Sequence, residues 1–227
     1  MTSDILLCTS HPALIIGAGG SLDMNGYTLS CDGDGIGVRL TDSDTVLEDT
    51  AGGGSIENCN NGVSAEGGGG HSIYDINATA NFIAGIALWS SGNSVETSYA
   101  NGNWGMGIRL MGDGNRVRNS EAMGNSLQGV KIVGNDSLIQ LNDTSSNGAS
   151  GIAIDGGDGG IIADNLSDNN GTHGIKMLGL GQVGYLIIGN TAMGSGGADM
   201  ADDSFPARNG NVWIRNDFDT ANNACIQ

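Results

Sequence analysis

Four of the eight basic residues recur at one position of a regular sequence pattern. Arg39, Arg109, Lys131 and Lys176 each come two residues after the glycine of a Gly-Ile or Gly-Val pair. If the pattern stacks in space, these like charges lie close together and repel one another. In a chain with 25 acidic and only eight basic residues, such a row of cations is not expected by chance. We therefore expect an anion-binding surface at this row.

Cations of this kind support chemistry on carboxylates. A guanidinium stays charged and binds a carboxylate through two hydrogen bonds, so Arg109 is predicted to neutralise the carboxylate of a uronate. Lys131 is predicted to remove the adjacent proton if its cationic neighbours favour the neutral amine. His173, three residues before Lys176, is a further candidate acid or base. A lyase or an epimerase needs these steps.

In each repeat, the residue two positions after the one equivalent to the row is predicted to flank the site. Trp89 offers a ring for stacking and Met111 an apolar contact. The structural alternative is that the long basic side chains cover a sheet face, keep it soluble and pair with Glu66, Asp155 or acids of loops. The predicted substrate-binding residues are Trp89, Arg39, Glu66, Met111, Asp155 and Lys176.

The elements that must position these residues are short strands in a repeating coil. Copies of the Gly-Ile or Gly-Val motif begin at residues 62, 85, 107, 129, 151 and 174, and a fixed period of this length marks a solenoid. Each repeat carries three short apolar elements with alternating polarity, which is typical of strands. We predict an all-β, right-handed, single-stranded parallel β-helix of about 22 residues per turn, with the basic row facing outward.

A column of asparagines has the same period. Asparagines occur at positions 81, 103, 125, 147 and 169, each 22 residues after the one before. Stacked amides hydrogen-bond to one another and to the backbone of turns. We predict that this column is a structural ladder.

The ends of the chain differ from the middle, as the caps of a solenoid must. We predict a single domain over residues 1–227, with a cap and first turn at 1–34, repeats at 35–195 and a C-terminal cap at 196–227. The first turn contains a hairpin-like Asn25-Gly26. Trp213 and Phe218 are predicted to cover the C-terminal end of the core.

The motif Gly-Ile-x-Leu, followed by Asn-x-Val and Ala-x-x-Asn, resembles the repeats of the pectate-lyase-like parallel β-helix superfamily over residues 35 to 195. That superfamily includes polysaccharide lyases, hydrolases, epimerases, periplasmic binding proteins and phage tailspikes. Its lyases use Arg or Lys on an outward sheet face, often with calcium. The residues themselves predict no cofactor, and the resemblance implies calcium as the one metal to consider.

Composition narrows the partners and the compartment. A net charge of −17 disfavours nucleic acid and anionic membranes, and no apolar run is long enough to span a bilayer. Cys8 and Cys31 bracket the first turn and are predicted either to form a disulfide or to be buried thiols; no Cys-x-x-Cys pair suggests zinc. We expect a secreted or extracellular protein whose signal peptide is absent from this sequence.

Several residues outside the row are weaker candidates. Tyr99 and Tyr185 are possible proton donors, although outward tyrosines are common on β-helices. His11 and His71 are distant from His173 in sequence, so a histidine metal cluster is not expected. A group of aspartates after the last repeat either binds calcium or forms a solvated loop; its members are Asp199, Asp202 and Asp203.

Three functions agree with these features. The first is a lyase- or epimerase-type enzyme acting on an anionic, uronate-type polysaccharide. The second is a small-molecule lyase, isomerase or cyclase that binds an amphiphilic acid on the same scaffold. The third is a non-catalytic surface or carbohydrate-binding module. The oligomeric state does not follow from the sequence.

Overall fold

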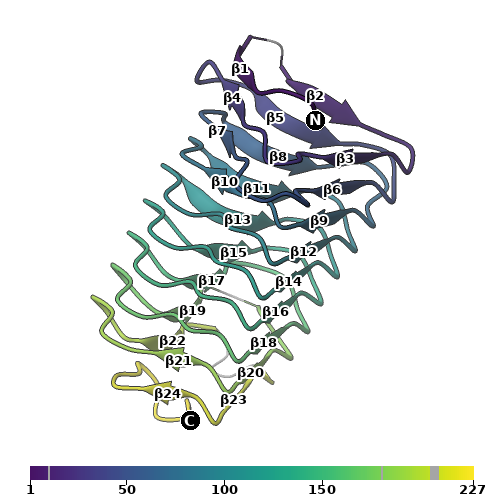
Figure 1. Cartoon of the computed structure of the whole chain (residues 1–227). Helices are drawn as coiled ribbons and strands as arrows, with labels where there is room; N and C mark the ends of the chain where they lie inside the picture. The colour runs from purple at the N-terminus through teal and green to yellow at the C-terminus, as the bar shows by residue number, and fades with distance from the viewer. Residues whose placement is uncertain (10, 180, 205–209) are drawn as a thin grey trace.

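The computed structural model describes residues 1–9, 11–179, 181–204 and 210–227. Within these residues the chain forms short strands joined by turns and bends, and it contains no helix. The strands coil into a parallel β-solenoid whose turns stack from the N-terminus to the C-terminus (Figure 1). This confirms the predicted all-β solenoid.

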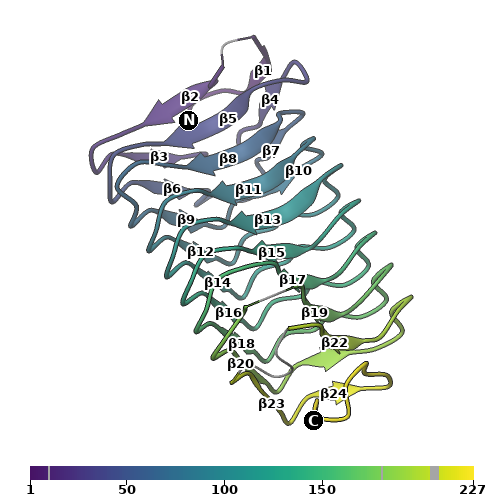
Figure 2. The ribbon, with the colours of Figure 1, turned by 180° about the vertical axis from the view of Figure 1, so that it is seen from behind.

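Sheet 1 is a nine-stranded parallel sheet that takes one strand from each turn. Its strands carry the Gly-Ile and Gly-Val motifs, and Figure 2 shows them from behind. In order they are β2 (Leu14–Ile16), β5 (Ile36–Leu40), β8 (Asn61–Ala65), β11 (Ala84–Leu88), β13 (Met106–Leu110), β15 (Val130–Ile132), β17 (Ile152–Ile154), β19 (Ile175–Met177) and β22 (Met200–Asp202).

Sheet 2 follows sheet 1 in every turn and is also nine-stranded and parallel. Its strands are β3 (Ser21–Asp23), β6 (Val46–Glu48), β9 (Ser72–Tyr74), β12 (Ser94–Glu96), β14 (Arg116–Arg118), β16 (Leu138–Gln140), β18 (Ile161–Ala163), β20 (Leu186–Ile188) and β23 (Val212–Ile214).

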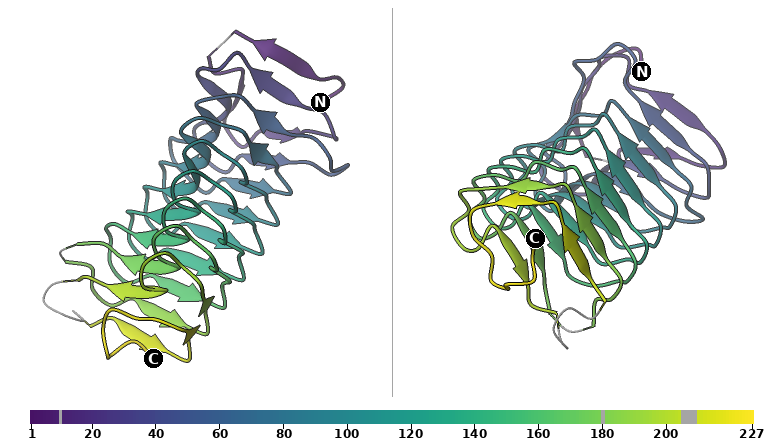
Figure 3. Two further views of the ribbon diagram at one scale, coloured as in Figure 1. Left: turned by 90° about the vertical axis from the view of Figure 1, so that its left-hand side faces the viewer. Right: turned by 90° about the horizontal axis from the view of Figure 1, so that it is seen from below.

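Sheet 3 closes each turn and is narrower. It begins with four strands, β1 (Ile5–Cys8), β4 (Leu29–Cys31), β7 (Ile56–Glu57) and β10 (Ala78–Thr79). Isolated parallel bridges from Asn77 through Tyr99 to Thr191 continue it, and it ends with β21 (Thr191–Ala192) paired to β24 (Asp217–Phe218). Figure 3 shows the stacked turns from the side and from below, and the buried side chains of the three sheets form one core.

In each turn, each of the three sheets contributes a few inward side chains to the core. On sheet 1, Ile86, Ile108 and Ile152 are fully buried, as are Leu88 and Leu110 two residues further along. Small residues such as Ala78 and Ala100 fill the narrow wall at sheet 3. Each fully buried aliphatic side chain contributes about 1.5–3 kcal/mol relative to exposure. Alternation with period 2 therefore fixes which side chains point outward.

The ladders extend beyond the predicted repeat region at both ends. Strands β2, β3 and β4 pair in parallel with β5, β6 and β7, so the strands on either side of Asn25-Gly26 lie in different sheets and form no hairpin. At the other end, Trp213 is buried in the core and its indole N–H donates to Asp202 Oδ2 at 3.0 Å.

The turn that contains β17 and β18 is longer than 22 residues, and this shifts the asparagine ladder. The asparagine ladder runs from Asn81 through Asn103, Asn125 and Asn147, but its next member is Asn170, whose Oδ1 accepts from the Asn147 amide. The prediction of Asn169 is therefore wrong: this residue is exposed. The shift arises because the connection from β17 to β18 holds one residue more than the one from β15 to β16.

The cysteine pairing also differs from the prediction. Cys31 forms its disulfide with Cys59, 28 residues later, and not with Cys8. Cys31 ends β4 and Cys59 lies just after β7, the strand that pairs with it on the next turn. Cys8 lies on the preceding turn, where β1 pairs with β4 and Cys8 is in register with Cys31. Cys31 thus has a cysteine on each neighbouring turn, and its disulfide is with the one on the following turn.

Candidate functional site

The predicted basic row is a single ladder on the outward face of sheet 1. Arg109 is in direct register with Lys131, and Ala153 separates Lys131 from Lys176. Arg39 stands further toward the N-terminus, beyond Ser64 and Ala87. The residues directly before and after each of these cations in the sequence point inward and are buried. The chain therefore brings these cations to one wall, with Arg109 and Lys176 three rungs, about 14 Å, apart.

Three of these cations have a carboxylate partner on the following turn. Lys131 Nζ lies 2.7 Å from Asp155 Oδ2, and Lys176 Nζ lies 3.0 Å from Asp203 Oδ2. Arg39 Nε is 3.4 Å from Glu66 Oε1, an ion pair without hydrogen-bond alignment. In each pair the acid stands two residues after the row position. The structural alternative predicted for Glu66 and Asp155 is thus present in the fold.

The ion pair at Lys131 bears on its predicted role. Lys131 Nζ is directed at Asp155 Oδ2 at 2.7 Å, while the guanidinium of its neighbour Arg109 turns toward Trp89. The role of Lys131 as a base remains a prediction.

Arg109 differs from the other members of the row. Its Cζ lies 4.9 Å from the ring centroid of Trp89, and its Nε donates to Met111 Sδ at 3.2 Å. Among the residues that the structure describes, no carboxylate pairs with it. Trp89 is 44% exposed and Arg109 is half-buried, so both side chains can be reached from solvent. A cation over an exposed aromatic ring contributes about 0.5–1 kcal/mol.

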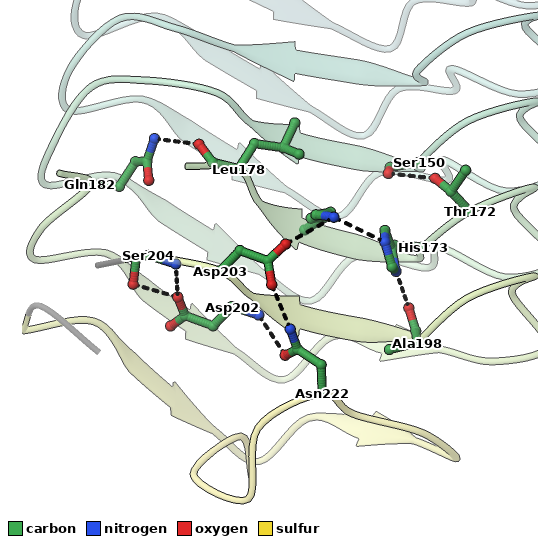
Figure 4. A network of polar contacts seen from close by, with 11 residues as sticks. Ser150, Thr172, His173, Leu178, Gln182, Ala198, Asp202, Asp203, Ser204 and Asn222 are labelled. Atoms are coloured by element: carbon green, nitrogen blue, oxygen red, sulfur yellow. Dashed lines mark hydrogen bonds and ion pairs between the residues drawn. The ribbon is translucent and has the colours of Figure 1, made fainter. Parts of the chain in front are cut away.

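His173 and Lys176 form a polar network at the C-terminal end of the row. His173 Nδ1 lies 2.8 Å from the carbonyl oxygen of Ala198, and its Nε2 lies 3.2 Å from Lys176 Nζ. Asp203 joins Lys176 to Asn222, whose Nδ2 donates to Asp203 Oδ1 at 2.7 Å (Figure 4). Because a carbonyl only accepts, Nδ1 carries the proton, and Nε2 holds a lone pair toward the ammonium.

Two other candidates from the sequence, Tyr185 and His71, have structural roles. Tyr185 is fully buried and its hydroxyl donates to the Gly156 carbonyl; burial, with Asp158 and Asp136 nearby, raises its pKa well above the ordinary value. His71 is buried and bonds to Thr45 Oγ1 and to the Glu66 carbonyl.

The three late aspartates do not converge. Asp199 accepts from Ser195 and Thr220, Asp202 from Ser204 and Trp213, and Asp203 binds Lys176. Across the described ranges, no group of three or more His, Cys, Asp or Glu side chains is placed to hold a metal ion.

Two features of the site were not predicted. Asp203 was predicted either to bind calcium or to lie in a solvated loop, although its position, two residues after the row position, could have identified it as the partner of Lys176. Trp104 is 67% exposed and Phe82 43%. They directly follow Asn103 and Asn81 of the asparagine column, at the corner that leads into sheet 1. Their position after this column could have indicated that they are exposed at this corner.

The chain is similar to several known β-helix proteins. Residues 37–192 match the family described as the right handed beta helix region. The periplasmic alginate epimerase AlgG is 15% identical, with a TM-score of 0.68 over 86% of this chain and 50% of its own. The A-module of the Azotobacter vinelandii mannuronan C-5 epimerase AlgE4 is 14% identical, with a TM-score of 0.62 over 96% of this chain and 84% of its own.

A third similar structure is the Dettilon tailspike protein, 16% identical, with a TM-score of 0.50 over 96% of this chain and 53% of its own. This chain thus spans half the length of AlgG. At these identities the similarities show the fold. A search of curated protein sequences finds none that matches the chain. No helix among the described residues is both long and apolar enough to cross a membrane.

Proposed function

Because this chain belongs to the right-handed β-helix family, we propose that it binds an anionic, uronate-type polysaccharide on the outward face of sheet 1 and epimerises its uronate residues. Arg109 and Trp89 bind one sugar by ion pairing and stacking. Lys131 supplies a positive charge one rung away. The His173–Lys176 pair, three rungs from Arg109, is the reaction centre.

The observation that supports this reaction centre is the contact between His173 Nε2 and Lys176 Nζ. A neutral imidazole is held by the Ala198 carbonyl with its lone pair directed at a cation. When a uronate carboxylate becomes a second carboxylate partner of Lys176 beside Asp203, the ammonium turns toward it, and the His173 lone pair is released beside the carbon that carries this carboxylate. One residue then balances the charge while its neighbour accepts the proton.

The reaction follows from these two roles. His173 Nε2 takes the proton from the carbon next to the carboxylate, and the electron pair of that bond delocalises into the carboxylate, whose charge Lys176 offsets. Solvent water then gives a proton to the opposite face of the ring, which yields the epimer, and the protonated His173 releases its proton to the resulting hydroxide. In the lyase outcome the glycosidic oxygen instead leaves the neighbouring carbon and takes up a proton, so the chain breaks and a double bond remains.

The test is exchange of the reacting proton in D2O. We expect deuterium to enter oligouronates at the carbon next to the carboxylate, and the rate to fall by about 100-fold or more in His173→Gln and Lys176→Gln. Arg116→Gln is the matched control, because it removes one charge from the exposed face of sheet 2. Equal exchange in all variants would rule out this reaction centre.

A second candidate is a non-catalytic carbohydrate-binding module. The observation that favours it is that Arg39, Lys131 and Lys176 are already paired with carboxylates. In that case oligouronates bind and Arg109→Ala weakens the binding, but no deuterium enters. The small-molecule lyase, isomerase or cyclase has no such observation in its favour: the cleft beside Tyr99 and the cleft beside Phe82 are both lined by residues outside the basic row.

Compartment and metal use complete the proposal. The Cys31–Cys59 disulfide supports action outside the reducing cytosol, and AlgG is described as periplasmic. Asp155 and Asp203 are occupied by ammonium groups, so we propose that the reaction uses no calcium. Chelation with EDTA should then leave deuterium exchange unchanged.

A further inference from the structure

A second surface lies at the corner between sheets 2 and 3, away from the basic row. From β6 to β7 the chain takes residues 49–55, whereas one turn later, from β9 to β10, it takes only residues 75–77. The extra residues form a projecting loop with Gly52 and Gly53 at its tip. Both glycines have positive φ, 67° and 89°, and open space around them.

The loop is fixed at its base by two carboxylates. Asp49 is buried, and its oxygens accept from the backbone N–H groups of Gly26 and Gly54 at 2.5 and 3.0 Å. Asp23, on the preceding turn, accepts from the backbone and the hydroxyl of Thr50 at 3.1 and 2.6 Å. The wall that the loop forms is thus preorganised, which lowers the entropic cost of binding.

Between this loop and the outward face of sheet 3 lies a cleft of about 610 Å³. Tyr99 offers an aromatic surface in it and is 46% exposed. Asp75 and Asn77 also line the cleft, and within the described part of the chain their side chains have no hydrogen-bond partner. A volume of this size suits a small ligand.

The charge of the cleft selects the ligand. No Lys, Arg or His lines it, whereas Asp49 and Asp75 do. A uronate would meet repulsion here and no counter-charge. An uncharged sugar would meet a ring for stacking, a carboxylate that accepts from two hydroxyls and an amide that donates and accepts.

We propose that this cleft binds an uncharged glycosyl residue, with its ring on Tyr99 and its hydroxyls on Asp75 and Asn77. The chain then holds two carbohydrate surfaces, one for an anionic sugar on sheet 1 and one for an uncharged sugar at the corner between sheets 2 and 3. The second surface does not depend on the reaction proposed for the first.

The test uses an immobilised panel of neutral gluco-, manno- and galacto-oligosaccharides and of acidic oligouronates, probed with the whole chain. We expect binding to at least one neutral class, and a loss of about tenfold or more in its affinity, by calorimetry, for Tyr99→Ala. Tyr99→Phe should retain binding, and Asp75→Asn should weaken it. Tyr74→Ala is the control, because this tyrosine is equally exposed but lies outside the cleft.

The outcomes separate the two surfaces. Lys176→Gln should leave binding of neutral sugars unchanged, so failure of the sheet 1 proposal does not affect this one. The cleft proposal is overturned if no neutral class binds, or if the affinity is the same in Tyr99→Ala as in the wild type. Circular dichroism checks that Tyr99→Ala folds, and Tyr99→Phe provides the folded comparison.

Discussion

At the residue scale, buried asparagine amides join successive turns. Asn170 Oδ1 accepts from the Asn147 backbone and its Nδ2 donates to the Ser167 carbonyl, at 2.9 Å each. Replacing it by alanine leaves these buried groups without partners, which costs about 1–3 kcal/mol. We expect Asn170→Ala to lower the free energy of unfolding by this amount in urea titrations.

The neighbouring residue supplies the control for this prediction. Asn169 is exposed and has φ of 55°, a conformation that glycine adopts readily. Asn169→Gly should therefore change stability by less than about 1 kcal/mol. If the two variants were equally destabilised, the ladder would not pass through Asn170 as the structure places it.

At the element scale, a carboxylate fastens the C-terminal turn. Although burial opposes ionisation of Asp199, hydrogen bonds from the Ser195 backbone and from the hydroxyl and backbone of Thr220 lower its pKa below the ordinary 3.8. A pKa lowered by folding gives stability that is complete above the unfolded value and is lost as the pH falls through the folded value.

The turn that carries Thr220 should therefore loosen only below about pH 3.8. The measurement is amide hydrogen exchange at Thr220 between pH 5 and pH 2. The protection factor, which is the intrinsic exchange rate divided by the observed rate, should fall across this range. Asp199→Asn should show weak protection throughout this range. Full protection of Thr220 at pH 2 in the wild type would contradict the assignment.

At the scale of the whole molecule, net charge opposes compactness. A charge of −17 is distributed along one narrow coil, and the repulsion reaches about 30 Å at 0.01 M salt but only about 3 Å at 1 M. We expect added sodium chloride over this range to raise the urea midpoint of unfolding. A lower midpoint at high salt would mean that the few ion pairs on sheet 1 outweigh the repulsion.

The solenoid, the inward residues of its first sheet and the alignment of the basic row could be predicted from the sequence. Each depends on local chain geometry: strands alternate with period 2, and a repeat of fixed length places equivalent residues on one wall. Arg109 and Lys131 became neighbours for this reason, although they are 22 residues apart. The catalytic and binding roles of these residues remain predictions.

Tertiary structure decided whatever depends on contacts between turns of unequal length. One added residue after Asp155 moved the ladder from Asn169 to Asn170. The disulfide joins Cys31 to Cys59 on the following turn. A projecting loop forms one wall of the cleft beside Tyr99. Side-chain direction across turns likewise set the partner of each cation. The period of a sequence specifies which residues share a wall, but loop length and packing specify what each of them touches.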